Sequence, residues 1–208
     1  SLRTPASFCG VVGFRPSPGV VPNELRSVGL NPFSVLGPMG RTVADAALLL
    51  SAMIDDDPRD PFGSGIDPEL AEPLQPADLA SLRVAISEDL GVAPLDNDIR
   101  ECFRRKTDTI RHIFTDAQDH DPPFDDDLHR AFEVLRCVNY LSAHGEKVEN
   151  HRDLLTPNVV ANVDMAANFT MTDVAWAHAK QTSLYKGYIK MFTEVDLLLS
   201  PAAAVSPF

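Results

Sequence analysis

Cysteine is scarce in this sequence, which contains three cysteines among 208 residues. Their number is odd and their spacings are wide, so we expect no disulfide framework and favour a reducing compartment, the cytoplasm. No run of about 18 apolar residues exists, which argues against a membrane-spanning helix. Basic residues are also few, since 18 stand against 30 acidic residues and the net charge is −12. This balance argues against a general nucleic-acid binder.

What the chain does have is an ordinary globular composition, with 44% hydrophobic and 23% charged residues. That composition excludes a disordered chain, a coiled coil and a collagen-like fibre. A length of 208 residues is enough for one substantial domain or two small ones. The first residue is serine rather than methionine, so either a start methionine was removed or the chain is a piece of something longer.

Strands and helices alternate in the secondary structure that the sequence predicts. Residues 1–41 are rich in glycine and proline, which predicts loops and turns around one short strand at 11–14. Residues 55–80 are a Pro- and Asp-rich connection, and residues 116–127 form an acidic loop. Helices are expected near 42–54, 96–115, 128–144, 149–166 and 172–193, with strands at 82–87 and 195–200. The alternation predicts an α/β fold with a β-sheet covered by helices.

Two of the expected helix starts carry a capping signature. Thr42 and Thr170 are each followed three residues later by an aspartate, Asp45 and Asp173. A hydroxyl at this position accepts a hydrogen bond from the third residue's backbone, and that residue's carboxylate returns one. On the first of these helices, five apolar residues are expected to share one buried face: Val43, Ala46, Ala47, Leu50 and Ile54.

Parts of the core can also be predicted. Cys9 and Cys137 are interpreted as small core residues. Residues 195–200 form a nearly continuous apolar run after a helix, which predicts a strand buried on both faces.

No pattern in the sequence predicts a metal site. The acidic runs at 55–57 and 125–127 are interpreted as solvated loops, because neither has the alternating ligands and tight glycine turn of a calcium site. The six histidines show no zinc spacing. A Ser-His-Asp triad that uses one of these histidines stays open, because triads are recognised by geometry rather than by spacing.

Three blocks in the first quarter of the chain carry the strongest functional signal. Residues 1–6 read Ser-Leu-Arg-Thr-Pro-Ala, residues 9–16 read Cys-Gly-Val-Val-Gly-Phe-Arg-Pro, and residues 37–42 read Gly-Pro-Met-Gly-Arg-Thr. In kind and order, these blocks resemble those of the amidase signature family of serine hydrolases. A looser similarity continues at 82–87, from 96 onward and at 195–201, so the resemblance spans essentially the whole chain.

The resemblance implies that Ser1 is the acyl-enzyme nucleophile of an amide hydrolase whose substrate is a small-molecule amide. A serine hydroxyl is a weak nucleophile until a neighbour takes its proton. In the family, a second serine in a cis peptide and a lysine base do this, and the lysine needs a lowered pKa. Arg3 is expected to support the nucleophile loop by donating hydrogen bonds to backbone carbonyls. The resemblance implies no metal and no nucleotide cofactor.

The family's lysine and cis-serine precede the nucleophile, whereas Ser1 is the first residue of this sequence. The chain's five lysines lie in no matching motif, so none inherits the role of base. We therefore interpret residues 1–208 as part of a single amidase domain truncated at both ends, with an incomplete mixed β-sheet covered by helices. Such a piece is expected to be inactive alone and to self-associate through exposed strand edges, with a homodimer as one form.

Three other functions stay open at this point. One is the A subunit of an aminoacyl-tRNA amidotransferase, although residues 161–165 lack the arginine of the Arg-Ile-x-Leu-Gly segment that those subunits usually carry. Another is a hydrolase with an N-terminal nucleophile, in which the free amino group activates Ser1. The residues after Ser1 fit the amidase blocks far better. The last is a non-catalytic, truncated paralogue that acts as a binding or structural protein.

Overall fold

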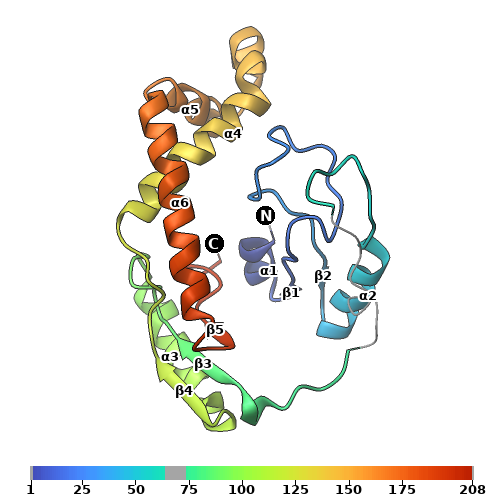
Figure 1. Cartoon of the computed structure of the whole chain (residues 1–208), viewed down its shortest axis with the longest axis vertical. Helices are drawn as coiled ribbons and strands as arrows, with labels where there is room; N and C mark the ends of the chain where they lie inside the picture. The colour runs from blue at the N-terminus through green and yellow to red at the C-terminus, as the bar shows by residue number, and fades with distance from the viewer. Residues whose placement is uncertain (1, 64–73, 208) are drawn as a thin grey trace. The chain divides into compact units, whose positions relative to one another are not determined.

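The computed structural model describes residues 2–63 and 74–207, and it combines helices with short strands (Figure 1). Its helices are α1 (Arg3–Cys9), α2 (Val43–Met53), α3 (Asn97–Ile110), α4 (Asp127–His151), α5 (Pro157–Ala166) and α6 (Met171–Met191), with 3-10 turns η2 (Leu79–Ser81), η3 (Arg111–Ile113) and η4 (Arg152–Leu154). Its strands are β1 (Val12–Gly13), β2 (Met39–Gly40), β3 (Arg83–Ile86), β4 (Asp116–Asp119) and β5 (Leu197–Leu199). The structure therefore confirms a fold of mixed helix and sheet.

Contacts along the chain separate it into two compact units. The first unit lies within residues 1–79, 94–110 and 201–208, and the second within residues 80–93 and 111–200. The three sequence blocks 1–6, 9–16 and 37–42 belong to the first unit. The larger sheet and the long helices α4 and α6 belong to the second.

The second unit is built on a parallel sheet in the order β4-β3-β5. The apolar run at β3 makes it the central strand, and its residues Val84, Ala85 and Ile86 are buried. Val84 pairs with Ala117 on one side and with Leu197 on the other. The predicted strand at 82–87 is thus confirmed, and it joins two segments that lie far apart in the sequence (Figure 1).

The predicted acidic loop at 116–127 is wrong over its first residues, because β4 occupies 116–119. The sequence Asp-Ala-Gln-Asp has low strand propensity, so nothing local predicts this strand. Its backbone nevertheless pairs with all of β3, from Arg83 opposite Asp116 to Ile86 opposite Asp119. Pairing with a buried neighbour therefore decides the conformation here.

The predicted strand at 195–200 is shorter than expected and is not buried on both faces. β5 covers 197–199, and Leu197 is 38% exposed. Among the described residues β5 pairs with β3 alone, so it is an outer strand of this sheet. An apolar run after a helix predicted the strand correctly, but it carried no information on which face is covered.

Helix α4 packs against both α5 and α6 in the second unit (Figure 1). It is one helix of 25 residues, whereas the sequence predicted separate helices at 128–144 and 149–166. Gly145 lies inside this helix, although glycine in a helix costs about 1 kcal/mol relative to alanine. The helix continues since Val148, one turn later, is 4% exposed and gains burial. Cys137 on the same helix is fully buried, as expected.

Both predicted capping boxes are confirmed. The Thr42 hydroxyl accepts from the Asp45 amide at 3.1 Å, and the Asp45 carboxylate accepts from the Thr42 amide at 3.1 Å. Thr170 and Asp173 make the same pair of bonds at the start of α6. Ala46 and Leu50 are buried on α2, but Val43 is 60% exposed, so the expected apolar face is wrong at its first residue.

The loop expected over residues 1–41 contains a short helix that the sequence did not predict. Helix α1 spans Arg3–Cys9 and ends at Gly10, whose positive φ of 62° suits a residue without a side chain. Cys9 at its end is exposed, so the prediction that Cys9 is a core residue is wrong. The strand predicted at 11–14 is present in short form as β1, paired antiparallel with β2.

The acidic run at 125–127 is not simply a solvated loop. The Lys180 ammonium on α6 lies 2.5 Å from Asp125 and 3.2 Å from Asp127. The run therefore joins the start of α4 to the middle of α6. Within the predicted connection at 55–80, residues 64–73 lie outside the described residues.

A buried ion pair organises the irregular part of the first unit. The side chains of Arg26 and Asp60 are 2% and 1% exposed, and the Arg26 guanidinium donates to the Asp60 carboxylate. Burial acts to raise the pKa of Asp60. Backbone hydrogen bonds from Phe62 and Asn23 and the bond from Arg26 outweigh it and lower that pKa below its ordinary 3.8. Arg26 also donates to the Ser34 carbonyl at 2.9 Å, so one pair ties three loop segments together.

Replacing Asp60 with asparagine should destabilise the first unit, because Arg26 would keep a buried charge without its partner. We expect Asp60→Asn to lower the free energy of unfolding by about 3 kcal/mol. Urea unfolding measures this loss. The control is Asp56→Asn, at an exposed position, which should change stability by less than about 0.5 kcal/mol. Equal effects of the two substitutions would contradict the role given to the ion pair.

The same pair predicts a pH dependence with a definite sign. Because the pKa of Asp60 is lowered by folding, its stabilisation is complete above the ordinary value of 3.8. This stabilisation is lost as the pH falls through the lower pKa that Asp60 has in the folded state. Unfolding free energies measured between pH 5 and about pH 2.5 should therefore fall more steeply in the natural sequence than in Asp60→Asn. Parallel curves for the two proteins would show that Asp60 is not responsible.

Candidate functional site

The predicted nucleophile Ser1 lies outside the described residues, so the site is built from the residues after it. Leu2 is the N-cap of α1, and its carbonyl accepts the first helical hydrogen bond from the Ala6 amide at 3.0 Å. Arg3 is the first residue of the helix, and its side chain is exposed. The structure does not test the roles predicted for Ser1 and Arg3.

The fold brings the three sequence blocks together around Leu2. Block 9–16 contains β1 and block 37–42 contains β2, and the two strands form an antiparallel ribbon with Gly13 opposite Met39. The Phe14 amide extends the ribbon by donating to the Pro38 carbonyl at 3.0 Å. Gly13 packs against the backbone of Leu2, and Gly37 packs against its side chain. Segments nearly 40 residues apart in sequence therefore meet beside the position that follows Ser1.

The connection between the two strands is held closed by arginines. Arg15 donates to the Pro32 carbonyl at 2.8 Å, and Arg26 donates to the Ser34 carbonyl. These bonds satisfy carbonyls in a stretch without regular secondary structure, where no ladder partner exists. The ribbon is thus supported from its long loop as well as by its own pairing.

The five lysines of this chain all lie on helices. Lys106 lies on α3, Lys147 on α4, and the other three on α6. Lys180 is held between two carboxylates, and its hydrogen bond to Asp125 raises its pKa. A lysine that is to accept a proton near neutral pH needs the opposite shift. Lys180 therefore joins α6 to α4 and is not suited to be a base.

Two histidines make contacts within the second unit. His129 Nε2 lies 2.9 Å from the Val92 carbonyl oxygen, and the His144 ring contacts Tyr140 on the same helix. In the described part of the chain, no group of three His, Cys, Asp or Glu residues could hold a metal ion. A triad of Ser1 with a histidine stays a prediction, since Ser1 is not described.

A buried serine that no sequence pattern singled out lies in the second unit. Ser87 is 1% exposed, and its hydroxyl donates to the Asp121 carboxylate at 2.6 Å. The same oxygen accepts from the Leu90 amide at 2.9 Å. Leu90 has a positive φ of 58°, so this turn is strained and the two hydrogen bonds stabilise it. The hydroxyl is thus engaged as donor and acceptor, which suits a structural role.

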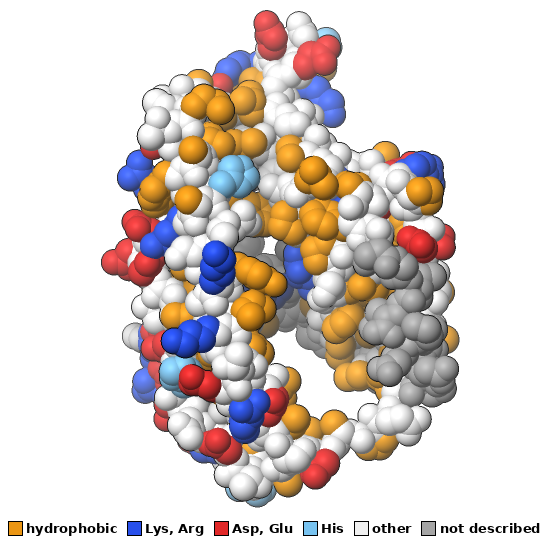
Figure 2. All heavy atoms as spheres, in the orientation of Figure 1, with side chains coloured by type: hydrophobic (Ala, Val, Ile, Leu, Met, Phe, Trp, Pro, Cys, Tyr) orange, Lys and Arg blue, Asp and Glu red, His pale blue; other side chains and the backbone are white. Residues whose placement is uncertain are grey.

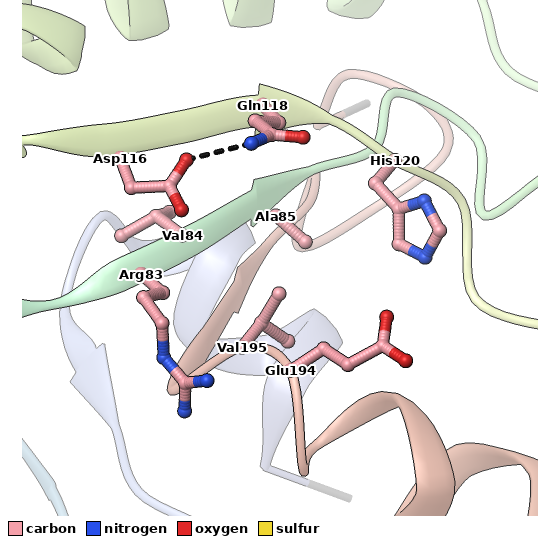
Figure 3. A pocket seen from close by; sticks show the side chains of 8 residues that line it. All are labelled: Arg83, Val84, Ala85, Asp116, Gln118, His120, Glu194 and Val195. Atoms are coloured by element: carbon pink, nitrogen blue, oxygen red, sulfur yellow. Dashed lines mark hydrogen bonds between the residues drawn. The ribbon is translucent and has the colours of Figure 1, made fainter.

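A cavity of about 180 Å³ lies beside the larger sheet, within the second unit (Figure 3). Its lining comprises Arg83, Val84, Ala85, Asp116, Gln118, His120, Glu194 and Val195. Arg83 donates to Asp196 at 2.8 and 3.1 Å, and this interaction lowers the pKa of Asp196 to about 2. The lining has no serine, threonine or cysteine, so the cavity offers no hydroxyl or thiol nucleophile for acyl transfer.

On the face drawn in Figure 2, acidic and basic side chains are interspersed over the second unit. Among the helices in the described residues, none is both long enough and apolar enough to cross a membrane.

Comparison with known sequences shows which protein family this chain resembles. The family model described as Amidase matches residues 1–208. An acylamidase of Rhodococcus erythropolis is 25% identical over 209 residues, which cover 100% of this chain and 44% of that protein. The A subunit of the glutamyl-tRNA(Gln) amidotransferase from Synechococcus sp. (strain JA-2-3B'a(2-13)) is 37% identical over 236 residues, covering 100% of this chain and 45% of that protein. The chain thus spans about half the length of these curated relatives.

Solved structures agree with this assignment at the level of the fold. A bacterial aryl acylamidase of the amidase signature family superposes with a TM-score of 0.81 at 21% identity, over 100% of this chain and 45% of that one. A fatty acid amide hydrolase gives 0.67 at 19% identity, over 100% of this chain and 38% of that one. Together with the match of the family model over all 208 residues, the packing of the three blocks around Leu2 leads to one conclusion: this chain belongs to the Amidase family.

Proposed function

We propose that this chain forms part of an amide hydrolase in which Ser1 is the nucleophile. The observation that carries the proposal is the convergence of blocks 9–16 and 37–42 on Leu2, the residue bonded to Ser1. A nucleophile at a loop-to-helix junction needs its neighbours fixed, since reacting atoms must be held close to their productive distance. The match to the Amidase family supports the same chemistry.

In the proposed reaction the Ser1 oxygen attacks the carbonyl carbon of a small-molecule amide. The base takes the hydroxyl proton as the C–O bond forms, and the tetrahedral intermediate collapses when the C–N bond breaks. The departing nitrogen takes that proton and leaves as ammonia or an amine, so that an ester to Ser1 remains. Water then attacks the ester, releases the carboxylic acid and restores the hydroxyl. No step requires a metal or a nucleotide.

The base and its relay serine are proposed to come from sequence outside these 208 residues. The resemblance to the family supports this, because there the lysine and the cis-serine precede the nucleophile. Among the chain's own lysines, Lys180 is engaged by Asp125 and Asp127, and the hydrogen bond to Asp125 raises its pKa. The two compact units are then proposed to be parts of one amidase domain, within which 55–80 is a connection.

The A subunit of an amidotransferase is the second candidate, and specific observations favour it. The Synechococcus relative is 37% identical over the whole chain, and a counterpart from Desulforapulum autotrophicum is 30% identical over 237 residues. Against it, residues 161–165 on α5 lack the arginine typical of such subunits. A non-catalytic paralogue remains the third candidate.

The central prediction concerns Ser1 in the product of the longest open reading frame that contains this chain. That protein should hydrolyse simple amides, and Ser1→Ala should lower kcat by about 10³-fold or more. The 208-residue chain alone should show no turnover, because the proposed base is not in it. Turnover of the whole protein, of its Ser1→Ala variant and of the 208-residue chain is measured as ammonia release. Ser17→Ala, at an exposed serine of the first unit, is the matched control.

Each outcome of that assay separates the candidates. Turnover by the 208-residue chain that Ser1→Ala abolishes would overturn the claim that the base lies elsewhere. Turnover that depends on a second, co-purified protein and uses glutamine as nitrogen donor would favour the amidotransferase. A folded whole protein without turnover would favour the non-catalytic paralogue.

Arg3 is proposed to support the nucleophile loop rather than to touch the reacting atoms. Arg3→Ala should therefore lower kcat by about tenfold, while Ser1 keeps its chemistry. Arg105→Ala, an exposed arginine on α3, serves as the control and should leave kcat unchanged. A loss as large as that of Ser1→Ala would instead assign Arg3 a direct role in the reaction.

A further inference from the structure

Gly13 and Gly37 lie so close to Leu2 and its neighbours that a residue with a Cβ atom would not fit at either position without movement. A Cβ atom built on Gly13 would lie 2.6 Å from the Ala6 Cβ and 3.1 Å from the Leu2 carbonyl oxygen. A Cβ on Gly37 would lie 2.2 Å from the Phe14 carbonyl oxygen and 2.8 Å from the Leu2 Cδ1. Real Cβ atoms essentially never approach other atoms within 3.0 Å. Neither glycine can therefore be replaced without movement of its neighbours.

These contacts hold Leu2 at both its backbone and its side chain. The Leu2 carbonyl that faces Gly13 also accepts the Ala6 amide, which is the first hydrogen bond of α1. The Leu2 side chain lies against Gly37, two residues before β2. Gly13 lies in β1 and Gly37 lies just before β2, and the Phe14–Pro38 hydrogen bond joins the two segments. The ribbon thus sets both the position of Leu2 and the direction of its peptide.

We infer that Gly13 and Gly37 are positioning residues for the nucleophile, an inference that rests on the proposed role of Ser1. Consecutive Cα atoms are about 3.8 Å apart, so a displacement of Leu2 is passed to Ser1 with little loss. Relief of the 2.6 Å contact requires a movement of several tenths of an ångström in Ala6, whose amide is bonded to the Leu2 carbonyl that itself would lie 3.1 Å from the new Cβ. Acyl transfer is sensitive to such shifts, because a misplacement of about 1 Å can cost about 100-fold in rate.

A glycine outside the ribbon supplies the control for this inference. Gly40 is not suited, because it pairs with Val12 in the same ribbon and a Cβ there would lie 2.8 Å from the Ala46 backbone nitrogen. Gly29 is suited, since its nearest contact would be Pro61 Cγ at the ordinary distance of 3.5 Å. Gly37 is less suited to the test, because its contact with the Phe14 backbone threatens folding.

The experiment compares Gly13→Ala and Gly29→Ala in the whole protein for which turnover dependent on Ser1 has been established. Gly13→Ala should lower kcat by about 100-fold with KM within about threefold of normal, whereas Gly29→Ala should keep kcat per folded molecule within about threefold. Tm is measured for each variant. Equal losses of kcat in Gly13→Ala and Gly29→Ala, or no loss in folded Gly13→Ala, would overturn the inference.

A double variant that exchanges the small side chains at positions 6 and 13 distinguishes a positioning effect from a general loss of stability. The atom nearest to a Cβ at position 13 is the Ala6 Cβ, so Ala6→Gly removes the main obstacle. The double variant Ala6→Gly/Gly13→Ala should regain at least about tenfold of the kcat that Gly13→Ala loses, whereas Ala6→Gly alone should not raise kcat. Absence of rescue in a folded double variant would contradict a steric effect through α1.

A second readout does not depend on activity. In the Ser1→Ala background, hydrogen exchange of the Ala6 amide reports on its bond to the Leu2 carbonyl. Gly13→Ala should accelerate this exchange, and Gly29→Ala should not. If Ser1→Ala retains full turnover, the proposed function fails whatever the exchange shows. If turnover depends on Ser1 but exchange and kcat are unchanged in Gly13→Ala, the positioning inference fails alone.

Discussion

The close approach of a glycine-containing ribbon to Leu2 is the constraint on which the proposed site depends. Such a close approach is possible only where no Cβ intervenes, and Gly13 in β1 and Gly37 just before β2 meet that condition. The start of α1 is thereby held by contacts from residues far along the chain. A seven-residue helix is too short to be stable from its own hydrogen bonds, so this packing also explains why α1 forms.

The rest of the first unit can be understood as support for that ribbon. The β1–β2 connection has almost no regular secondary structure, and its carbonyls are satisfied by Arg15 and Arg26. The buried partner of Arg26, Asp60, comes from beyond α2 and receives two backbone amides as well. Gly40 in turn lets the ribbon lie on the capped first turn of α2. Steric fit and a buried ion pair thus give the stability that a larger apolar core gives elsewhere.

The sequence predicted correctly the features that depend on a few neighbouring residues, such as the starts of two helices. Thr42 and Thr170 formed their capping boxes as expected, because a capping box involves only four consecutive residues. Strand β4 and the unbroken helix at Gly145 could not be predicted locally, since pairing with β3 and burial of the following turn decide them. For the site, family blocks pointed to the right region, but the contacts on Leu2 follow only from the three-dimensional packing.

The proposed function requires that Ser1 carries the acyl group, and mass spectrometry tests this most directly. The whole protein would be treated with a fluorophosphonate, which reacts with activated serines, and then digested. We expect one adduct, located on Ser1 in the peptide that ends at Arg3, and protection from labelling by an amide substrate. An adduct on another residue such as Ser87, in protein that hydrolyses amides, would contradict the assignment of Ser1.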